Sequence, residues 1–184
     1  MDNIESIILG GGCFWCIEEI YNQLNGVENA ISGYAGGFIS YPDYKLICNS
    51  ETGHAEVVKV EFDSSIISLK QILEIFFVMH DPTTIDRQGN DIGPQYRSII
   101  LYNSERQKDI INETLNEITD KKIWSNKIVT QIIEYDDNTA AKFWIAEEYH
   151  QKYFQKNPTQ GYCQVVINPK INKFRKEFFQ LLKN

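Results

Sequence analysis

The sequence predicts an α+β sandwich of the split β-α-β type, with long functional loops and a coiled C-terminal region. Two observations support this fold class. Apolar side chains alternate between strand and helix spacing in the order β-α-β-β-α-β-α-β, and the intervals between these elements are uneven. An all-parallel, doubly wound sheet would require a more regular alternation. At 184 residues with 42% hydrophobic content, the chain is expected to form one domain, residues 1–184, around a sizeable core.

The first strand and the first helix flank a glycine-rich turn. An apolar run predicts a short strand at residues 7–9, and apolar residues at helical spacing predict a helix over residues 17–24. The turn between them, residues 10–16, reads Gly-Gly-Gly-Cys-Phe-Trp-Cys. Cys13 therefore lies where a helix begins. The unpaired N–H groups and the positive dipole end of that helix are expected to favour a thiolate and to lower the pKa of the cysteine.

Two bulky aromatic residues distinguish this cysteine from an ordinary buried one. A lone cysteine in a glycine-rich turn is more often a packed, unreactive side chain. Phe14 and Trp15 occupy the first turn of the helix and cannot both face the core without exposing an apolar partner. An apolar pocket wall beside the Cys13 thiol is the more economical explanation, so we predict a reactive cysteine.

The next part of the chain is predicted to be rich in loops. An extended segment runs over residues 26–31, and the glycine-rich residues 32–37 are expected to form neither strand nor helix. Residues 38–53 continue without periodicity but carry several aromatic rings, which is typical of a functional loop. Alternating apolar and polar residues predict a strand over 54–63. Glu56 breaks the alternation near the start of that strand, where its carboxyl group could be half buried.

A well-marked helix and a polar loop follow. Residues 68–80 have helical apolar spacing behind an N-cap serine, and the helix is expected to end before Pro82. The loop of residues 82–97 is dense in hydrogen-bonding side chains, which is typical of a binding surface.

The remaining elements alternate between strand and helix. A capping Ser104 precedes one of the helices. The aromatic residues within 140–156 are predicted to pack in the core rather than to bind a cofactor, because periodic apolar faces usually pack. A coil is expected to open at Gly161. The predicted strands are 98–102 and 127–134, and the predicted helices are 104–122 and 171–183. Residues 140–156 are predicted to be mostly helical or tightly turned.

Composition excludes several classes of function. A net charge of −7 argues against a nucleic-acid surface, which needs clustered Lys and Arg. The longest apolar run, residues 75–79, is too short to span a membrane, and no export signal is recognised, so a cytoplasmic protein is expected. Four cysteines then indicate thiol chemistry or metal binding. Zinc fits poorly, because Cys13-x-x-Cys16 has no second pair and the three histidines lie far apart.

Six short motifs occur along the chain in a fixed order. They are Gly12-Cys13-Phe14-Trp15, Gly33-Tyr34-Ala35-Gly36-Gly37, Thr52-Gly53-His54-Ala55-Glu56, His80-Asp81-Pro82, the run from Arg87 to Ser98, and Gly161-Tyr162-Cys163. With them the chain resembles the peptide methionine sulfoxide reductase A family from about residue 7 to residue 168. The resemblance implies a ferredoxin-like α+β core, no metal or organic cofactor, and reduction of the S epimer of methionine sulfoxide, free or in proteins. It also implies thioredoxin as reductant.

The chemistry of that reaction fits the residues at the first turn. A sulfoxide reductase needs a nucleophile for sulfur, a proton donor for the departing oxygen and an apolar seat for the methyl group. Cys13 would supply the thiolate and become a sulfenic acid as methionine is released. Phe14 and Trp15 would hold the methyl group.

The resemblance also implies which residue donates the proton and which residues assist it. It assigns the acid to Glu56, assisted by Tyr44 and Tyr96, with Asp91 in the same site. A carboxylic acid donates near neutral pH only if its pKa is raised, and aromatic surroundings raise it by desolvation. Without the motif, Glu56 would be interpreted as a surface charge at a strand edge.

The resolving cysteine remains open between three positions. Cys163 matches the recycling position of the family by resemblance and lies in a predicted flexible coil, so it is the first choice. Cys16, where many family members carry glycine, is three residues from Cys13 and is the second choice. Cys48 lies in the aromatic loop without an evident aim towards the site.

Two other functions remain as alternatives. The Cys-x-x-Cys after a strand would also suit a thioredoxin-like disulfide oxidoreductase. A methionine sulfoxide sensor without turnover would use the same aromatic pocket but keep its thiols unchanged. Oligomeric state is not encoded in these features, and a monomer is the default expectation.

Overall fold

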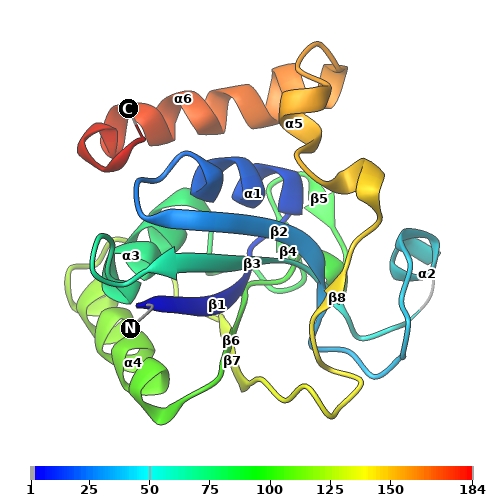
Figure 1. The fold of residues 1–184 in the computed structure, drawn as a ribbon, viewed down its shortest axis with the longest axis horizontal. Coiled ribbons are helices and arrows are strands. Elements are labelled where there is room, and N and C mark those ends of the chain that lie inside the picture. Colours follow the sequence, from blue (N-terminus) through cyan, green and yellow to red (C-terminus); the bar gives the residue numbers. More distant parts are fainter. Residues whose placement is uncertain (1–2, 50, 184) are drawn as a thin grey trace.

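The computed structural model describes residues 3–49 and 51–183, and its centre is a six-stranded sheet in the order β7-β6-β1-β3-β2-β8 (Figure 1). All neighbouring strands are antiparallel except β6 and β7, which are parallel. The strands are β1 (Ile4–Gly10), β2 (Val27–Ala35), β3 (Ala55–Asp63), β6 (Ile99–Tyr102), β7 (Gln131–Glu134) and β8 (Trp144–Ile145).

The predicted α+β class with a split β-α-β core is confirmed. The chain runs β1, α1, β2, β3, α3, β6, and these four strands lie in the order β6-β1-β3-β2, so each helix connects strands that are not adjacent along the sheet. A short two-stranded ribbon, β4 (Arg87–Gln88) and β5 (Asp91–Ile92), lies within the long polar loop. The longer helices are α1 (Phe14–Asn22), α3 (Leu69–Met79), α4 (Glu105–Asp120) and α6 (Asn168–Glu177).

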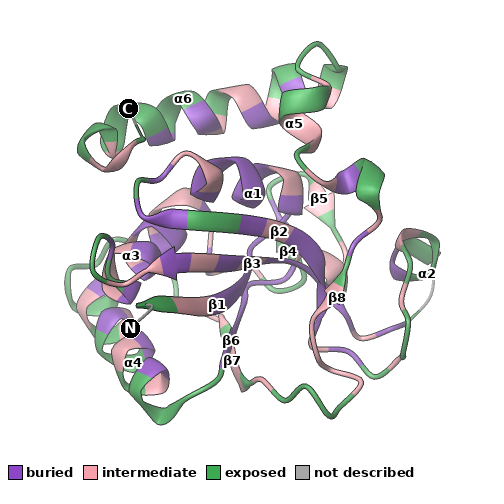
Figure 2. Cartoon of the chain, in the orientation of Figure 1, coloured by how far each residue is buried: buried purple, intermediate pink, exposed green. Residues whose placement is uncertain are grey.

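Alternation along the strands divides the core between the two faces of the sheet. In β1, Ile7 and Leu9 join the large cluster that also contains buried residues of α1, α3, α4 and α6, whereas Ile8 joins a smaller cluster on the other face. Figure 2 shows buried residues concentrated in the central strands and on α1 and α3. The α6 helix lies across α1 at the outer side of this helical layer (Figure 1).

The helix boundaries follow local capping. The Ser68 hydroxyl accepts a hydrogen bond from the backbone N–H of Gln71, while the Ser68 backbone N–H donates to Gln71 Oε1, a capping box that begins α3. Ser104 caps α4 in the same way through the Gln107 N–H. None of the helices in the described parts of the chain is long and apolar enough to cross a membrane.

The prediction that residues 32–37 form neither strand nor helix is wrong. β2 continues to Ala35, and Gly33 pairs with Val57 on one side and with Ile145 of β8 on the other. A Cβ at Gly33 would lie 2.4 Å from the ring of Phe143, so this glycine permits a close approach of β8 rather than a turn.

Two other segments also differ from their predictions. Residues 140–156, expected to be mostly helical or tightly turned, do contain a 3-10 turn η2 (Glu148–His150) and the short α5 (Tyr153–Lys156), but they also contain the strand β8, which was not predicted. The coil expected from Gly161 is helical at the cysteine, because a π-helical turn η3 (Cys163–Ile167) leads directly into α6. Cys163 is therefore buried in a helix and not placed in an open coil.

Candidate active site

Cys13 is the N-cap residue of α1, directly after the glycine turn that ends β1. Gly12 has a φ of 94°, and a Cβ there would lie 2.5 Å from the Gln88 side chain. A Cβ at Gly11 would lie 2.8 Å from the His80 ring. The glycines therefore let the strand turn sharply into the helix between two packed side chains, which fixes the position of the Cys13 thiol.

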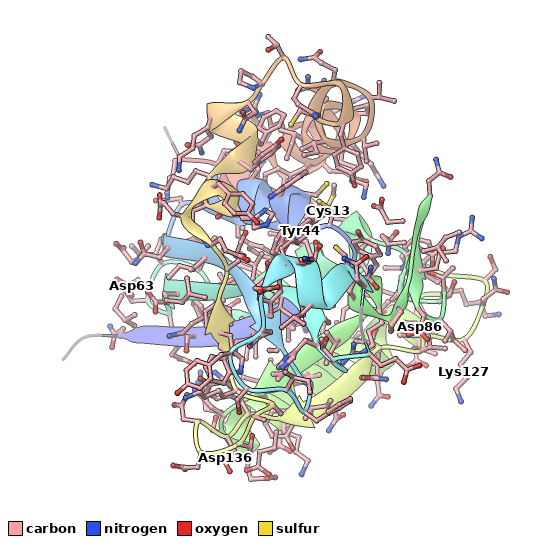
Figure 3. All side chains as sticks on the ribbon, turned by 90° about the vertical axis from the view of Figure 1, so that its right-hand side faces the viewer. Cys13, Tyr44, Asp63, Asp86, Lys127 and Asp136 are labelled. Atoms are coloured by element: carbon pink, nitrogen blue, oxygen red, sulfur yellow. The ribbon has the colours of Figure 1, made fainter. Side chains whose placement is uncertain are left out.

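The Cys13 thiol opens onto a cavity of about 210 Å³. All seven residues predicted to surround the substrate, the nucleophile included, line this cavity, together with one residue that was not predicted. Figure 3 shows Cys13 at the start of α1 and Tyr44 on the short helix α2 (Tyr44–Asn49). The lining residues are Cys13, Phe14, Trp15, Tyr44, Glu56, Asp91, Tyr96 and Tyr162.

Glu56 projects into the cavity from β3 and is only 2% exposed, so it is fully rather than half buried. Its Oε2 accepts a hydrogen bond of 3.1 Å from the backbone N–H of Phe14. Burial raises the pKa of Glu56 well above its usual value, and the nearby Cys13 raises it further, while the Phe14 N–H opposes the shift. Burial thus favours the protonated carboxyl group over the carboxylate.

The expectation of a lowered pKa for Cys13 is wrong. Burial raises the pKa of the Cys13 thiol, and the adjacent Cys16 raises it further, against hydrogen bonds from the Trp15 backbone and the Tyr162 hydroxyl. The N-terminal N–H groups of α1 act in the expected direction, but desolvation of a thiolate in this closed site outweighs them. Burial thus favours the protonated form of both Cys13 and Glu56.

Phe14 and Trp15 form an ordered apolar wall. The Trp15 ring stacks on Tyr153 at 3.7 Å between centroids and 8° between planes, and its Nε1–H donates to His150 Nδ1 at 3.1 Å. The His150 ring also packs 5.0 Å from Phe14. The indole is thus fixed on one face and at its edge, which leaves a preorganised seat for a small apolar group.

The residues that the sequence analysis missed come from the C-terminal part of the chain. The Tyr162 hydroxyl donates to Asp91 Oδ2 at 2.8 Å and closes one side of the cavity. Glu147 accepts a 2.8 Å bond from the Tyr44 backbone N–H and another from the Tyr34 hydroxyl. Tyr162 could have been found, since it precedes Cys163 in the Gly-Tyr-Cys motif. Glu147 could not have been found, because the aromatic spacing of residues 140–156 predicted core packing and did not indicate a functional site.

The four cysteines are free thiols at different depths. Cys16 is buried and hydrogen-bonds with Cys13 inside the first turn of α1. Cys163 is buried, and burial raises the pKa of its thiol. The charge of the nearby Cys13 raises this pKa further. Cys48 is exposed on α2. Cys16 and Cys163 are thus the two buried thiols next to the nucleophile. Within residues 3–49 and 51–183, no group of three or more His, Cys, Asp or Glu side chains could hold a metal ion.

A cysteine at a helix start, a buried carboxyl group and an aromatic wall around one cavity are the side chains that a thiol-dependent reductase needs. The family model described as peptide methionine sulfoxide reductase matches residues 5–182. The chain belongs to this family, and it is an oxidoreductase that returns methionine sulfoxide to methionine.

Relatives support the assignment over nearly the full chain. A peptide methionine sulfoxide reductase MsrA of Trichodesmium erythraeum is 51% identical over 95% of this chain and 96% of its own length. One of Polynucleobacter asymbioticus is 48% identical over 99% of this chain and 93% of its own length. Among solved structures, the reduced form of Mxr1 from Saccharomyces cerevisiae aligns with a TM-score of 0.76 and 35% identity, covering 88% of this chain and 90% of that one.

Proposed function

We propose that this chain reduces the S epimer of methionine sulfoxide, free and in proteins, with Cys13 as nucleophile and Glu56 as acid. The observation that carries the proposal is a buried Glu56 carboxyl group, with its pKa raised by burial, in the cavity that Cys13 also lines. The substrate methyl group rests on Phe14 and Trp15, and the sulfoxide oxygen lies towards Glu56.

The proposed first step forms a sulfenic acid. Glu56 protonates the sulfoxide oxygen while the Cys13 sulfur attacks the sulfoxide sulfur, so a transient S–S bond forms and the proton of the Cys13 thiol passes to the Glu56 carboxylate. The hydroxyl group then transfers from the substrate sulfur to the Cys13 sulfur as the substrate S–O bond and the S–S bond break, so methionine leaves and Cys13 becomes a sulfenic acid. The hydroxyls of Tyr44 and Tyr96 assist at the oxygen, and Asp91 holds Tyr162 at the side of the cavity.

The proposed second step makes a disulfide. The thiol of Cys163 attacks Cys13 sulfur, a Cys13–Cys163 bond forms and water leaves. The π-helical turn of Cys163 supports this role, because such turns are rare and often mark functional sites. Cys16, in hydrogen-bond contact with Cys13, is the second candidate.

The disulfide is then reduced by thioredoxin. This part of the proposal is supported by Mxr1, for which a structure in complex with Trx2 exists. We also propose that the protein is a monomer of one domain, because one chain supplies every residue of the cavity. A cytoplasmic location would keep its four cysteines reduced.

The test combines chirality with a thiol count. We expect the wild type with dithiothreitol to consume the S epimer from a racemic methionine sulfoxide mixture and to leave the R epimer, as seen by chiral chromatography. One equivalent of substrate without reductant should remove two thiols. Cys13→Ser should have no activity, because a serine hydroxyl is a far weaker nucleophile at neutral pH. Turnover by that variant, or binding with thiols unchanged, would refute the mechanism.

A further inference from the structure

Arg97 is a buried cation without an ion-pair partner. Its side chain is 9% exposed, and none of the salt bridges between described residues includes it. Burial lowers the pKa of Arg97, and the charge of Asp86, which lies beyond ion-pair distance, opposes this shift. Taking a guanidinium out of water is costly, so its hydrogen bonds must compensate for the lost solvation.

The guanidinium instead bonds to three oxygen atoms from three segments. Its Nη2 donates to the Gly53 carbonyl at 2.8 Å, its Nη1 to the Pro94 carbonyl at 2.9 Å, and its Nε to Gln131 Oε1 at 3.0 Å. A Cβ at Gly36 would lie 3.2 Å from Nη2, so the group is packed closely on this side as well. A planar fork with several donors suits this arrangement, whereas the point charge of lysine does not.

Two of the three segments carry residues of the cavity. Gly53 precedes Glu56 by three residues, at the start of β3. Pro94 begins the 3-10 turn η1 (Pro94–Tyr96), which ends at Tyr96. Arg97 thus connects, through main-chain carbonyls, the segments that place the carboxyl group of Glu56 and the hydroxyl of Tyr96.

We propose that Arg97 is a positioning residue that sets the separation between Glu56 and Tyr96 across the cavity. The inference rests on the proposed roles of those two residues. The Arg97 guanidinium does not line the cavity, and the Phe14–Trp15 wall is held by other contacts. Loss of the guanidinium should therefore impair proton transfer at the oxygen while leaving binding of the methyl group intact.

The first test compares Arg97→Lys with a matched control. Arg87→Lys is the control, since Arg87 lies in the same loop and also donates to a backbone carbonyl, that of Gly89, but is exposed. We expect Arg97→Lys to lower kcat by about 10- to 100-fold with KM within about 2-fold of wild type, because small displacements of reacting groups have effects of this size. Arg87→Lys should match the wild type. A kcat within about 2-fold of wild type in Arg97→Lys, or an equal loss in both variants, would overturn the proposal.

The second test separates positioning from general loss of structure. Arg97→Ala leaves a space for a guanidinium ion, so added ethylguanidinium should restore part of kcat and ethylammonium should not. Gln131→Ala keeps Arg97 and removes one acceptor from an exposed position, and it should lower kcat less than Arg97→Lys, again with KM unchanged. Equal effects of the two ions, or unchanged kcat in Gln131→Ala, would contradict the proposal.

Glu56→Gln, measured in parallel, distinguishes two kinds of failure. If Glu56→Gln is as fast as the wild type, the proposed role of the acid fails and Arg97 loses the group that it positions. If Glu56→Gln is slow while Arg97→Lys remains fast, the mechanism stands and the assignment of Arg97 alone is wrong.

Discussion

Burial raises the pKa of both Cys13 and Glu56, because each becomes an anion when it ionises and burial removes the water that would solvate that anion. A protonated carboxyl group is useful at once, since it can donate to the departing oxygen. A protonated thiol is a poor nucleophile, so Cys13 must lose its proton as it attacks. Cys13 and Glu56 then need not both carry a negative charge at the same time, which suits a site with no cation among its lining residues.

Glu56→Gln tests this reasoning through rate and pH. The amide keeps the shape of the side chain but donates no acidic proton, so kcat should fall by about 100-fold or more with KM nearly unchanged. Because the pKa of Glu56 is raised, wild-type kcat should decline as pH rises through that pKa, and the variant should lack this decline. Steady-state rates from pH 6 to about 10 provide the measurement. A parallel decline in both proteins would assign the titration to another group.

The sequence was sufficient to predict which residue types could do the chemistry, but it did not show how deeply each side chain is buried. The nucleophile, acid and aromatic seat follow from motifs that keep their spacing, and Cys13, Phe14 and Glu56 do meet in the cavity. The sign of the Cys13 pKa shift depends on how closely Tyr162 and other distant residues cover the thiol. Tyr162 lies almost 150 positions after Cys13 in the chain, so a local sequence pattern around Cys13 cannot predict this contact.

At the scale of elements, α1 is joined to the strap, defined as residues 144–156, by a buried carboxyl group. Glu18 Oε2 accepts a 2.8 Å bond from the Lys152 N–H, and Lys152 has a left-handed φ of 53°. The Gln151 side chain adds bonds to the Ser32 N–H and carbonyl of β2. These bonds fix the strap residue Tyr153 where it stacks on Trp15, although they lie outside the cavity.

The Glu18 carboxyl group should make stability depend on pH. Burial raises its pKa from 4.5 to about 7, against hydrogen bonds from Lys152 and Ser32. The folded protein therefore holds this proton more tightly than the unfolded chain, and the resulting stabilisation is present below about pH 4.5 and lost as pH rises through 7. Glu18→Gln removes this dependence, so its free energy of unfolding relative to wild type should increase by up to about 3 kcal/mol between pH 5 and pH 8.

Urea unfolding of both proteins at the two pH values measures the change. Glu28→Gln, on an exposed position of β2, is the matched control for the loss of one carboxylate from the net charge. A difference between Glu18→Gln and wild type that stays constant with pH would show that Glu18 does not titrate as described.

The predictions of helices and strands were correct where the local sequence alone determines the conformation. The capped helix at α3 and the alternating strand β3 were predicted because capping and alternation are properties of a short stretch. The prediction for the end of β2 was wrong, and the strand β8 of the strap was not predicted, because pairing with neighbouring strands sets the conformation of these residues. Gly33 is locally a turn residue, yet β3 and β8 lie on both sides of it and hold it extended.

At the scale of the whole molecule, the proposed attack of Cys163 on Cys13 predicts that the C-terminal segment moves. Cys163 is buried in the π-helical turn that continues into α6, which packs across α1 (Figure 1). A disulfide has strict geometric demands, so we expect Cys163 to leave its helical position to meet Cys13 with correct geometry. We expect the π-helical turn to unwind in this step, because such turns are rare and often lie at functional sites. Unwinding would also carry Tyr162 away from Asp91 and open the cavity to a reductant.

Peptide mapping after one equivalent of sulfoxide tests this order of events. We expect a dominant Cys13–Cys163 bond and faster hydrogen exchange in residues 163–167 of the oxidised protein. Cys163→Ser should release one equivalent of methionine and then stop with thioredoxin, whereas the exposed-site variant Cys48→Ser should recycle normally. A dominant Cys13–Cys16 bond, with Cys163→Ser still recycled by thioredoxin, would assign resolution to the first turn of α1. The C-terminal segment would then have no need to unwind.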